Sequence, residues 1–493
     1  MSSVNHYHTT ALYRAAQVRE LDRLAMKSLG VDGHALMRRA GSAAFELIRV
    51  RWPEARSLSI FCGGGNNGGD GYVVAELARR AGLGVQLVAH RPVEELAGSA
   101  ARAASDWLAA GGAVEKPDSA LNGDVIVDAL LGTGLEGPVR EDCASSIQRI
   151  NQARRPVMAI DVPSGLNSDT GMVMGACVRA SATISFIGRK RGLYTGQAGS
   201  YCGQLHFDDL GAPADIYRRE KADAVLLDGN RLPVWLPPRR ADTHKGDLGR
   251  LLIMGGNLGM AGAPVLAGRA ALAAGSGLVT IATLTRHLAL APALQPELMT
   301  ADASWPEKAA EHIGRADVVA IGPGLGQDEW SKMLLRACLE SSVPLVVDAD
   351  ALNLLAQQPQ QRGRWILTPH PGEAARLLNT DTTAVMADRF AAVRKLAEKY
   401  RAVVVLKGHG TLVAAPDEPL AVCPYGGPAM ASAGMGDALT GMIASFAGQG
   451  LTLPEAARCG VVAHALAGDS AARRRRQVLA SQVIDKLGTI LPK

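Results

Sequence analysis

The sequence predicts an α/β protein of two domains, each built on a largely parallel sheet, and three observations support this. Short apolar segments alternate with helical segments along most of the chain, which is typical of βαβ units. The 55 glycines and an aromatic content of only 4% favour tight strand-to-helix turns and cores of Ala, Val and Leu. The length of 493 residues exceeds one ordinary core, and the alternation breaks between residues 221 and 243. We therefore expect domains at 1–225 and 240–493, joined by the proline-rich segment 232–240.

The spacing of apolar residues and the positions of glycine-rich turns predict the helices and strands of both halves in order. In the first half, the predicted helices are 14–29, 34–50, 72–81 and 92–110, and the predicted strands are 57–62, 84–89, 124–128 and 156–160. In the second half, the predicted strands are 251–254, 277–282, 317–321, 343–347, 365–367 and 402–406, with helices at 261–274 and 438–447.

A glycine-rich segment, residues 63–71, directly follows the first predicted strand. Six glycines among these nine residues indicate that the backbone approaches another group closely. The spacing does not match GxGxxG, so no dinucleotide fingerprint is predicted. Asn66, Asn67 and Asp70 add oxygen ligands of the type that hard cations prefer. A flexible turn is the alternative interpretation.

Two further strands of the first half also end in polar residues. Strand 124–128 ends on Asp128, and strand 156–160 leads into Asp161 and then Ser164. Each aspartate alone could be a loop cap. Because the carboxyl ends of parallel strands meet at one edge of a sheet, where ligands bind, the coincidence predicts a site there.

Polar motifs follow the strands of the second half as well. Asp348 and Asp350 end a buried strand, and His370 lies between two prolines that fix its backbone. Lys407 opens a segment of small donors, Lys407-Gly408-His409-Gly410-Thr411, that suits a nucleotide phosphate.

The most informative stretch of the second half is Gly434-Met435-Gly436-Asp437, at the start of an apolar helix. Unpaired backbone N–H groups at a helix N-terminus hold a phosphate or a developing oxyanion. Asp437 could take a proton from a hydroxyl group there. A structural N-cap is the alternative interpretation.

Composition narrows the function classes. The net charge of +5 permits an anionic ligand but does not argue for nucleic acid or a membrane, and Arg473–Arg476 is interpreted as a solvated helix end. Seven scattered cysteines without CxxC spacing predict reduced thiols and no zinc cluster. Residues Met1–Arg23 lack the apolar core of a signal peptide, and no apolar run approaches the ~20 residues of a membrane span. We expect a soluble, cytoplasmic protein.

Together the motifs resemble those of the bifunctional NAD(P)H-hydrate repair enzymes, in which an NAD(P)HX epimerase precedes an ADP-dependent NAD(P)HX dehydratase. They occur in the family's order and span nearly all of residues 10–490. The motifs are NNGGDG at 66–71, GTG at 132–134, DVPSGL at 161–166, KGD at 245–247, GPGLG at 322–326, TPHPGE at 368–373 and GMGD at 434–437. The resemblance implies an N-terminal Rossmann-like three-layer sandwich and a C-terminal ribokinase-like α/β domain.

The implied substrate is NADHX or NADPHX, the nicotinamide cofactor hydrated across C5–C6, with R and S epimers at C6. For the epimerase the resemblance implies Asp161 as the catalytic proton shuttle and K⁺ held by Asn67, Asp128 and Ser164. The implied substrate contacts are Asn66, Asn67, Gly68, Gly69, Asp70, Gly132, Thr133, Gly134, Leu135, Glu136, Gly137, Pro138 and Asp161.

For the dehydratase the resemblance implies that ADP, with Mg²⁺, activates the C6 hydroxyl as a phosphate ester, and that Asp437 is the catalytic base. The implied hydrate contacts are Ala263, Gly324, Gly326, His370 and Asp437; the implied ADP/AMP contacts are Lys407, Gly408, His409, Gly410, Thr411 and Gly436. A homo-oligomer that binds neither nucleic acid nor membranes is expected.

Two alternatives remain at this point. A vitamin-precursor kinase would share the GMGD loop, but it would not explain KGD at 245–247 together with HPGE at 370–373. A non-catalytic scaffold, as in mRNA decapping complexes, would not need Asn67, Asp128 and Asp161 intact.

Overall fold

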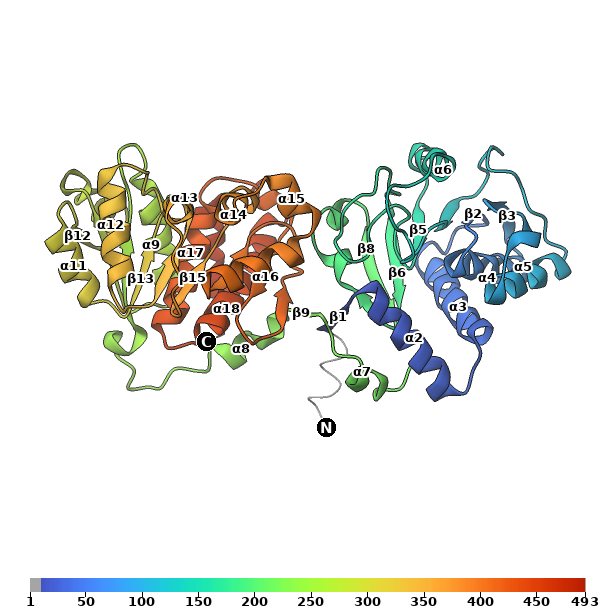
Figure 1. The fold of residues 1–493 in the computed structure, drawn as a ribbon, viewed down its shortest axis with the longest axis horizontal. Helices are drawn as coiled ribbons and strands as arrows, with labels where there is room; N and C mark the ends of the chain where they lie inside the picture. Colours follow the sequence, from blue (N-terminus) through green and yellow to red (C-terminus); the bar gives the residue numbers. More distant parts are fainter. Residues whose placement is uncertain (1–9, 493) are drawn as a thin grey trace. The chain divides into compact units, whose positions relative to one another are not determined.

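The computed structural model describes residues 10–492, and its chain divides into two compact units, residues 1–225 and 226–493 (Figure 1). Residues 1–9, the first part of the N-terminal segment interpreted above, lie outside the described residues. Every helix in residues 10–492 is too short or too polar to cross a lipid bilayer.

Six parallel strands form the main sheet of the first unit, in the order β3-β2-β4-β5-β6-β8. Their bounds are β2 Ser57–Cys62, β3 Gly84–Ala89, β4 Val125–Ala129, β5 Val157–Ile160, β6 Ala182–Phe186 and β8 Gln204–Asp208. The chain runs from β2 outward to β3 and then returns past β2 to β4. The loops that follow β2 and β4 therefore diverge, and such a switch point leaves a crevice for ligands at the carboxyl ends of the strands.

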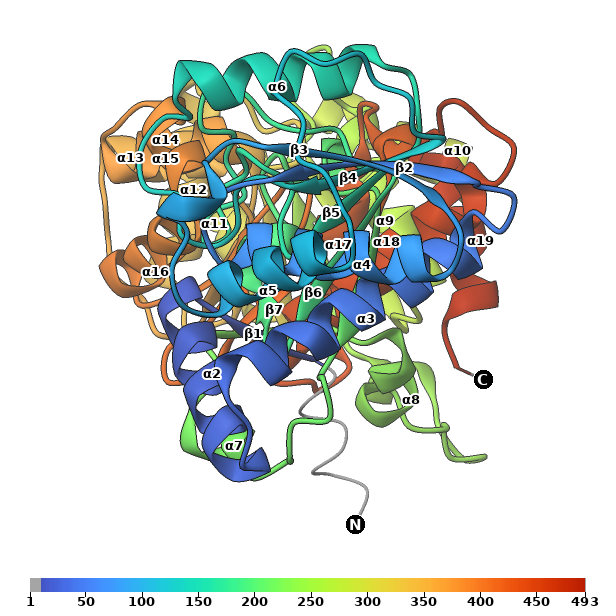
Figure 2. The same ribbon diagram turned by 90° about the vertical axis from the view of Figure 1, so that its right-hand side faces the viewer.

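Helices cover both faces of this sheet, which is the middle of three layers. They are α2 Ala15–Leu29, α3 Gly33–Arg51, α4 Asn66–Arg80, α5 Gly98–Ala109 and α6 Glu141–Gln152. Figure 2 shows α3, α4 and α5 on one face of the sheet and α6 on the other. Ile60 of β2 lies in the core under the first group of helices, whereas its neighbour Phe61 lies in the core with Ile147 of α6. The predicted three-layer α/β architecture is confirmed.

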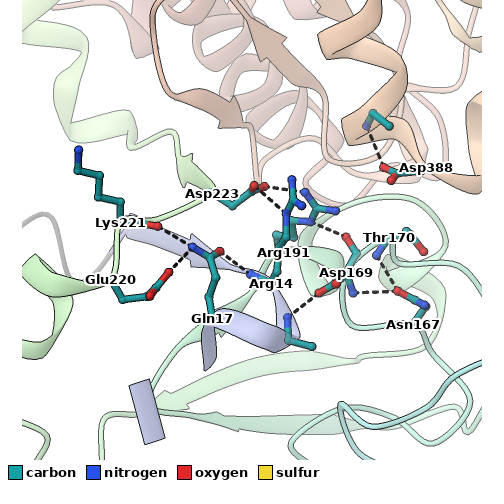
Figure 3. Close-up of polar contacts among 12 residues, drawn as sticks. Arg14, Gln17, Asn167, Asp169, Thr170, Arg191, Glu220, Lys221, Asp223 and Asp388 are labelled. Atoms are coloured by element: carbon teal, nitrogen blue, oxygen red, sulfur yellow. Dashed lines mark hydrogen bonds and ion pairs between the residues drawn. The ribbon is translucent and has the colours of Figure 1, made fainter. Parts of the chain in front are cut away.

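Three short strands of the first unit lie outside this sheet: β1 Ala11–Tyr13 pairs with β7 Arg189–Lys190 and with β9 Ala224–Leu226. A polar network holds them together (Figure 3). Asp223 accepts hydrogen bonds from Arg14 Nε (2.8 Å) and from the buried Arg191 Nη1 (2.6 Å). This network fixes the chain around Lys190, which is part of β7.

The sheet of the second unit has the order β12-β11-β10-β13-β14-β15-β16-β17-β18. Strands β10 to β16 are parallel to one another, β17 is antiparallel to β16, and β18 is antiparallel to β17. The strands are β10 Arg250–Met254, β11 Leu278–Thr283, β12 Met299–Asp302, β13 Val318–Ile321, β14 Leu345–Val347, β15 Trp365–Leu367, β16 Val403–Leu406, β17 Leu412–Ala414 and β18 Leu420–Val422. A second switch point lies between β10 and β13.

Two groups of helices pack around this sheet. The first group is α9 Gly262–Ala273, α17 Met435–Gly448, α18 Leu453–Ala472 and α19 Ala480–Ile490; the second is α11 Pro306–Gly314, α12 Glu329–Glu340, α13 Ala349–Gln357, α14 Pro371–Leu378, α15 Thr382–Ala387 and α16 Arg389–Tyr400. Helices α9 and α17 are in close contact because Gly441 lacks a side chain: a Cβ there would lie 2.0 Å from the Ala267 carbonyl oxygen.

Several predicted element boundaries are wrong. Helix α4 begins at Asn66 rather than at Tyr72, because Gly68, Gly69 and Gly71 serve close packing inside the helix instead of a loop. A Cβ on Gly68 would lie 1.9 Å from the Gly63 carbonyl oxygen. The segment predicted to be an aperiodic linker contains helix α8, Leu232–Trp235.

Candidate active sites

A cavity of about 890 Å³ opens at the switch point of the first unit. Its walls bring together most of the residues expected to bind the hydrate: Asn66, Asn67, Asp70, Gly132, Thr133, Gly134, Leu135, Glu136, Pro138 and Asp161. Gly68 and Gly69 are buried in α4 behind this wall, and Gly137 occupies an exposed turn with φ 74°, so these three do not line the cavity.

Asp161 lies at the carboxyl end of β5, in a left-handed backbone conformation with φ 67°. Such a conformation in a residue other than glycine is uncommon and is concentrated at functional sites. Its Oδ1 accepts a hydrogen bond from Lys190 Nζ, which also donates to the Phe186 carbonyl oxygen (3.1 Å). Lys190 is almost wholly buried, so the two charges compensate each other in the cavity wall.

Two further carboxyl groups, Asp22 and Asp70, line the same cavity. Burial raises the pKa of Asp22 to about 6. Burial, together with the nearby charges of Asp161 and Asp22, also raises the pKa of Asp70 well above its usual value. The cavity therefore combines a lysine-paired carboxylate with carboxyl groups that retain protons more readily.

An oxygen-only cluster, Asn67, Asp128 and Ser164, lies beside this cavity. Both side-chain polar atoms of Asn67 are buried without a hydrogen-bond partner. Ser164 donates through Oγ and its backbone N–H to the two oxygens of Asp128 (2.5 and 2.8 Å). Burial raises the pKa of Asp128 to about 6, and no Lys or Arg in residues 10–492 forms an ion pair with it. A buried amide without a partner and a buried carboxylate without a counter-charge offer oxygen donors of the kind that a hard cation prefers.

In the second unit, the GMGD motif forms the start of α17. Gly434, with φ 85°, is the N-cap residue and provides no side-chain hydrogen bond, and Asp437 lies in the first helical turn. The interpretation of Asp437 as a structural N-cap is therefore wrong. Burial and the nearby Asp348 raise the pKa of Asp437 to about 7, while Lys407 opposes the shift.

Lys407 follows β16 and lies next to this loop: a Cβ built on Gly436 would be 3.4 Å from Lys407 Nζ. Nζ donates to Asp348 Oδ1 (2.6 Å), and Thr440 Oγ1 donates to the other oxygen of Asp348 (2.8 Å). Burial disfavours the ionised form of Asp348, but Lys407 and these hydrogen bonds hold its pKa below the usual value. The lysine and the first turn of α17 thus converge where an anionic group would bind.

Of the residues expected to contact the hydrate, the structure places Ala263 and Gly324 side by side and fixes Gly326 and His370 by local hydrogen bonds. Ala263 and Gly324 are adjacent, since a Cβ on Gly324 would lie 3.2 Å from the Ala263 Cβ. Gly326 donates its backbone N–H to Asp350 (3.1 Å), which holds the GPGLG loop. His370 is the N-cap of α14, and its Nδ1 accepts the Gly372 N–H (3.0 Å).

The segment expected to bind ADP forms a turn after β16. Thr411 Oγ1 donates to the Gly408 carbonyl oxygen (2.9 Å), and Gly408 has φ 133°. Burial lowers the pKa of His409, and Gly410 completes the turn with φ 59°. Lys407 and Gly436 meet at one point, with the turn Gly408–Thr411 directly following the lysine.

Two family models cover much of the chain: a YjeF-related protein N-terminus matches residues 33–192, and NAD(P)H-hydrate dehydratase matches residues 251–489. A bifunctional NAD(P)H-hydrate repair enzyme Nnr from Coxiella burnetii is 46% identical over 98% of this chain and 99% of its own length. The chain belongs to the bifunctional NAD(P)H-hydrate repair enzymes. The relative of the same description from Escherichia coli is 44% identical over 97% of this chain and 94% of its own length.

Membership in the NAD(P)H-hydrate repair enzymes confirms the predicted resemblance and does not favour a vitamin-precursor kinase fused to a scaffold domain. A solved structure agrees with the predicted fold of the second unit. The ADP/ATP-dependent NAD(P)H-hydrate dehydratase from Bacillus subtilis, co-crystallised with ATP/Mg²⁺, matches 54% of this chain and 96% of its own with 31% identity and a TM-score of 0.50.

Two residues of the first site, Lys190 and Asp22, were not predicted from the sequence of this repair enzyme. Asp348 was noted at the end of a strand but was not assigned to the second site. Lys190 follows β6, a strand that the sequence analysis did not predict, and β6 pairs in parallel with β5, so its carboxyl end brings the lysine to Asp161. Asp348 could have been included, because it ends a buried strand as Asp128 does.

One group of potential metal ligands was not expected from the spacing of the cysteines. Cys143 lies with His90 and Asp142, and their ligand atoms are all within 4.8 Å of one another. The fold brings these residues together from β3 and α6, so spacing along the chain could not show the cluster.

Proposed function

We propose that residues 1–225 interconvert the R and S epimers of NAD(P)HX, and that residues 240–493 dehydrate the S epimer to NAD(P)H with ADP, releasing AMP and phosphate. The observation that carries the proposal is the cavity at the β2/β4 switch point, with the Asp161–Lys190 pair in its wall. The full-length similarity to repair enzymes that unite both activities supports it.

In the epimerase unit, the hydroxyl at C6 of the hydrate is part of a hemiaminal, so the N1 lone pair can expel it as water once it is protonated. Asp70, whose burial favours the protonated form, supplies this proton. Water then adds to the opposite face of the iminium carbon and gives its proton to Asp161. Lys190 compensates the charge of Asp161 and fixes the orientation of its carboxylate.

The remaining walls of this site would bind the rest of the cofactor. The start of α4 at Asn66, with the loop 132–138 facing it, presents backbone N–H groups to the pyrophosphate. Asn67, Asp128 and Ser164 would hold K⁺, which would balance the buried charge of Asp128 and order the loop after β4.

In the dehydratase unit, Asp437 takes the proton of the C6 hydroxyl while the hydroxyl oxygen attacks the β-phosphorus of ADP. The new O–P bond forms as the bridging Pα–O–Pβ bond to AMP breaks, and the helix N-terminus with Lys407 stabilises the charge in transfer. The phosphate then leaves C6 with its bonding electrons and takes up the proton that C5 loses, which restores the C5–C6 double bond. Ala263, Gly324, Gly326 and His370 would position the hydrate, and residues 407–411 with Gly436 would hold ADP, whose phosphates would carry Mg²⁺.

The decisive experiment adds the purified chain to a mixture of R and S NADHX and follows the near-ultraviolet absorbance of NADH. With ADP, the NADH absorbance should rise to the value expected if both epimers are converted to NADH. Without ADP, no NADH should form. Recovery without a nucleotide, or recovery of the S epimer alone, would contradict one of the two activities.

We also propose a cytoplasmic location and a homo-oligomeric state. All seven cysteines are buried free thiols, which fits a reducing compartment. Edge strand β12 and its surroundings expose Leu294, Met299 and Trp305, a surface that suits a second copy. Light scattering of the purified chain tests the oligomeric state.

A further inference from the structure

A cluster of soft and borderline metal ligands lies at the rim of the cavity of the first unit. His90 directly follows β3, and Asp142 and Cys143 lie in the first turn of α6. The ligand atoms of the three residues lie within 4.8 Å of one another, and His90 Nδ1 is 3.9 Å from Cys143 Sγ. In a tetrahedral zinc site, bonds of about 2.0 Å to nitrogen and about 2.3 Å to sulfur separate the two ligand atoms by about 3.5 Å.

The surroundings of the cluster orient each ligand. Ser146 Oγ lies 2.8 Å from His90 Nε2, so the other ring nitrogen faces Cys143. A metal-binding histidine typically has such an outer partner, which fixes the ring. The Asp142 Oδ1 accepts the backbone N–H of Cys143 (2.9 Å), which holds the carboxylate beside the thiol.

We propose that His90, Asp142 and Cys143 form a binding site for one thiophilic divalent cation of the zinc class. This site is separate from the oxygen-only cluster of Asn67, Asp128 and Ser164, which lacks sulfur and imidazole. One nitrogen, one sulfur and one carboxylate oxygen are a typical ligand set for zinc. Cys143 itself lines the cavity, so the fourth coordination position would be filled by water at the cavity rim.

Co²⁺ is the probe, because it occupies zinc sites and its bond to a thiolate gives a near-ultraviolet charge-transfer band. The full-length protein is treated with a chelator, reduced and titrated with Co²⁺. One equivalent should produce the charge-transfer band together with visible ligand-field bands, and Zn²⁺ should displace it. The absence of a charge-transfer band from the wild-type protein would overturn the proposal.

Variants localise the signal. Cys143→Ala should abolish the charge-transfer band, whereas the matched variant Cys202→Ala, at another buried cysteine of the same unit, should keep it. Asp142→Asn changes an exposed side chain and should fold normally, with Co²⁺ binding at least tenfold weaker. A band that survives Cys143→Ala, or Co²⁺ binding by Asp142→Asn at wild-type strength, would place the cation elsewhere.

Discussion

Among single residues, Asp437 is the most direct test of the dehydratase. Asp437→Asn should lower the rate of dehydration on the order of 10²–10⁴-fold, since asparagine cannot act as a base. The helix should remain intact, because its N-cap is Gly434 and Asp437 contributes no capping hydrogen bond. The assay follows ADP-dependent recovery of NADH from the S epimer, with epimerisation and thermal melting as controls. Near-normal turnover in a normally melting variant would rule out the catalytic role.

The same residue predicts a pH dependence. Burial and Asp348 raise the pKa of Asp437 to about 7, and only its ionised form can accept the hydroxyl proton. Dehydration should therefore fall roughly tenfold for each pH unit below the pKa and level off above it. The measurement is kcat for dehydration as a function of pH around 7. The residual kcat of Asp437→Asn should not show this fall at acidic pH.

The buried oxygen ligands predict a dependence on a monovalent ion. Epimerisation should survive strong chelators of divalent metals, because the ion proposed at Asn67, Asp128 and Ser164 is K⁺, which such chelators bind only weakly. Potassium should raise the melting temperature of the first unit, since it balances a buried charge, and Asp128→Asn should abolish this increase. Loss of epimerisation in EDTA that zinc restores would contradict the assignment.

Site residues could be predicted from the sequence where a strand delivers them. Asp128 is the last residue but one of β4 and Asp161 directly follows β5, and parallel strands bring such ends to one edge. Lys190 was missed because β6, the strand that precedes it and lies beside β5, was not predicted.

At the level of elements, helix α4 depends on glycines that make room for neighbouring backbone. Gly68→Ala should lower the free energy of unfolding by about 1–3 kcal/mol or more, because the new Cβ would lie 1.9 Å from the Gly63 carbonyl oxygen. Gly134→Ala is the matched control: nothing lies within 4 Å of its Cβ position, so a change within about 0.5 kcal/mol is expected. Chemical denaturation of both variants makes the comparison; equal stabilities would refute the packing role of Gly68.

Sequence reasoning missed or misplaced elements for different physical reasons. Strands β17 and β18 have three residues each, too few for a period of two to be recognised, and no polar motif follows them as Thr368-Pro369-His370 follows the equally short β15. The start of α4 was misplaced because glycine normally marks loops, whereas here tertiary packing overrides its low helix propensity.

For the whole molecule, the two activities should separate with the two units. Expressed apart, residues 1–225 should epimerise NADHX and residues 226–493 should dehydrate the S epimer, because each compact unit contains its own site. A fragment that starts at residue 240 should melt at a lower temperature than one that starts at 226, since it lacks α8, whose Leu232 and Trp235 are buried and which packs against α18. Dehydration that requires both units in one chain would contradict the proposed division.

The left-handed backbone of Asp161 limits what mutation can do to the first unit. Asparagine and glycine tolerate this conformation best, and both are reached from an aspartate codon by a single nucleotide change. Either replacement would remove the carboxylate that is proposed to shuttle the proton without straining the backbone, but it would leave the buried Lys190 without its counter-charge. During evolution, a folded but catalytically silent domain would therefore need a second change, at Lys190, besides the one at Asp161.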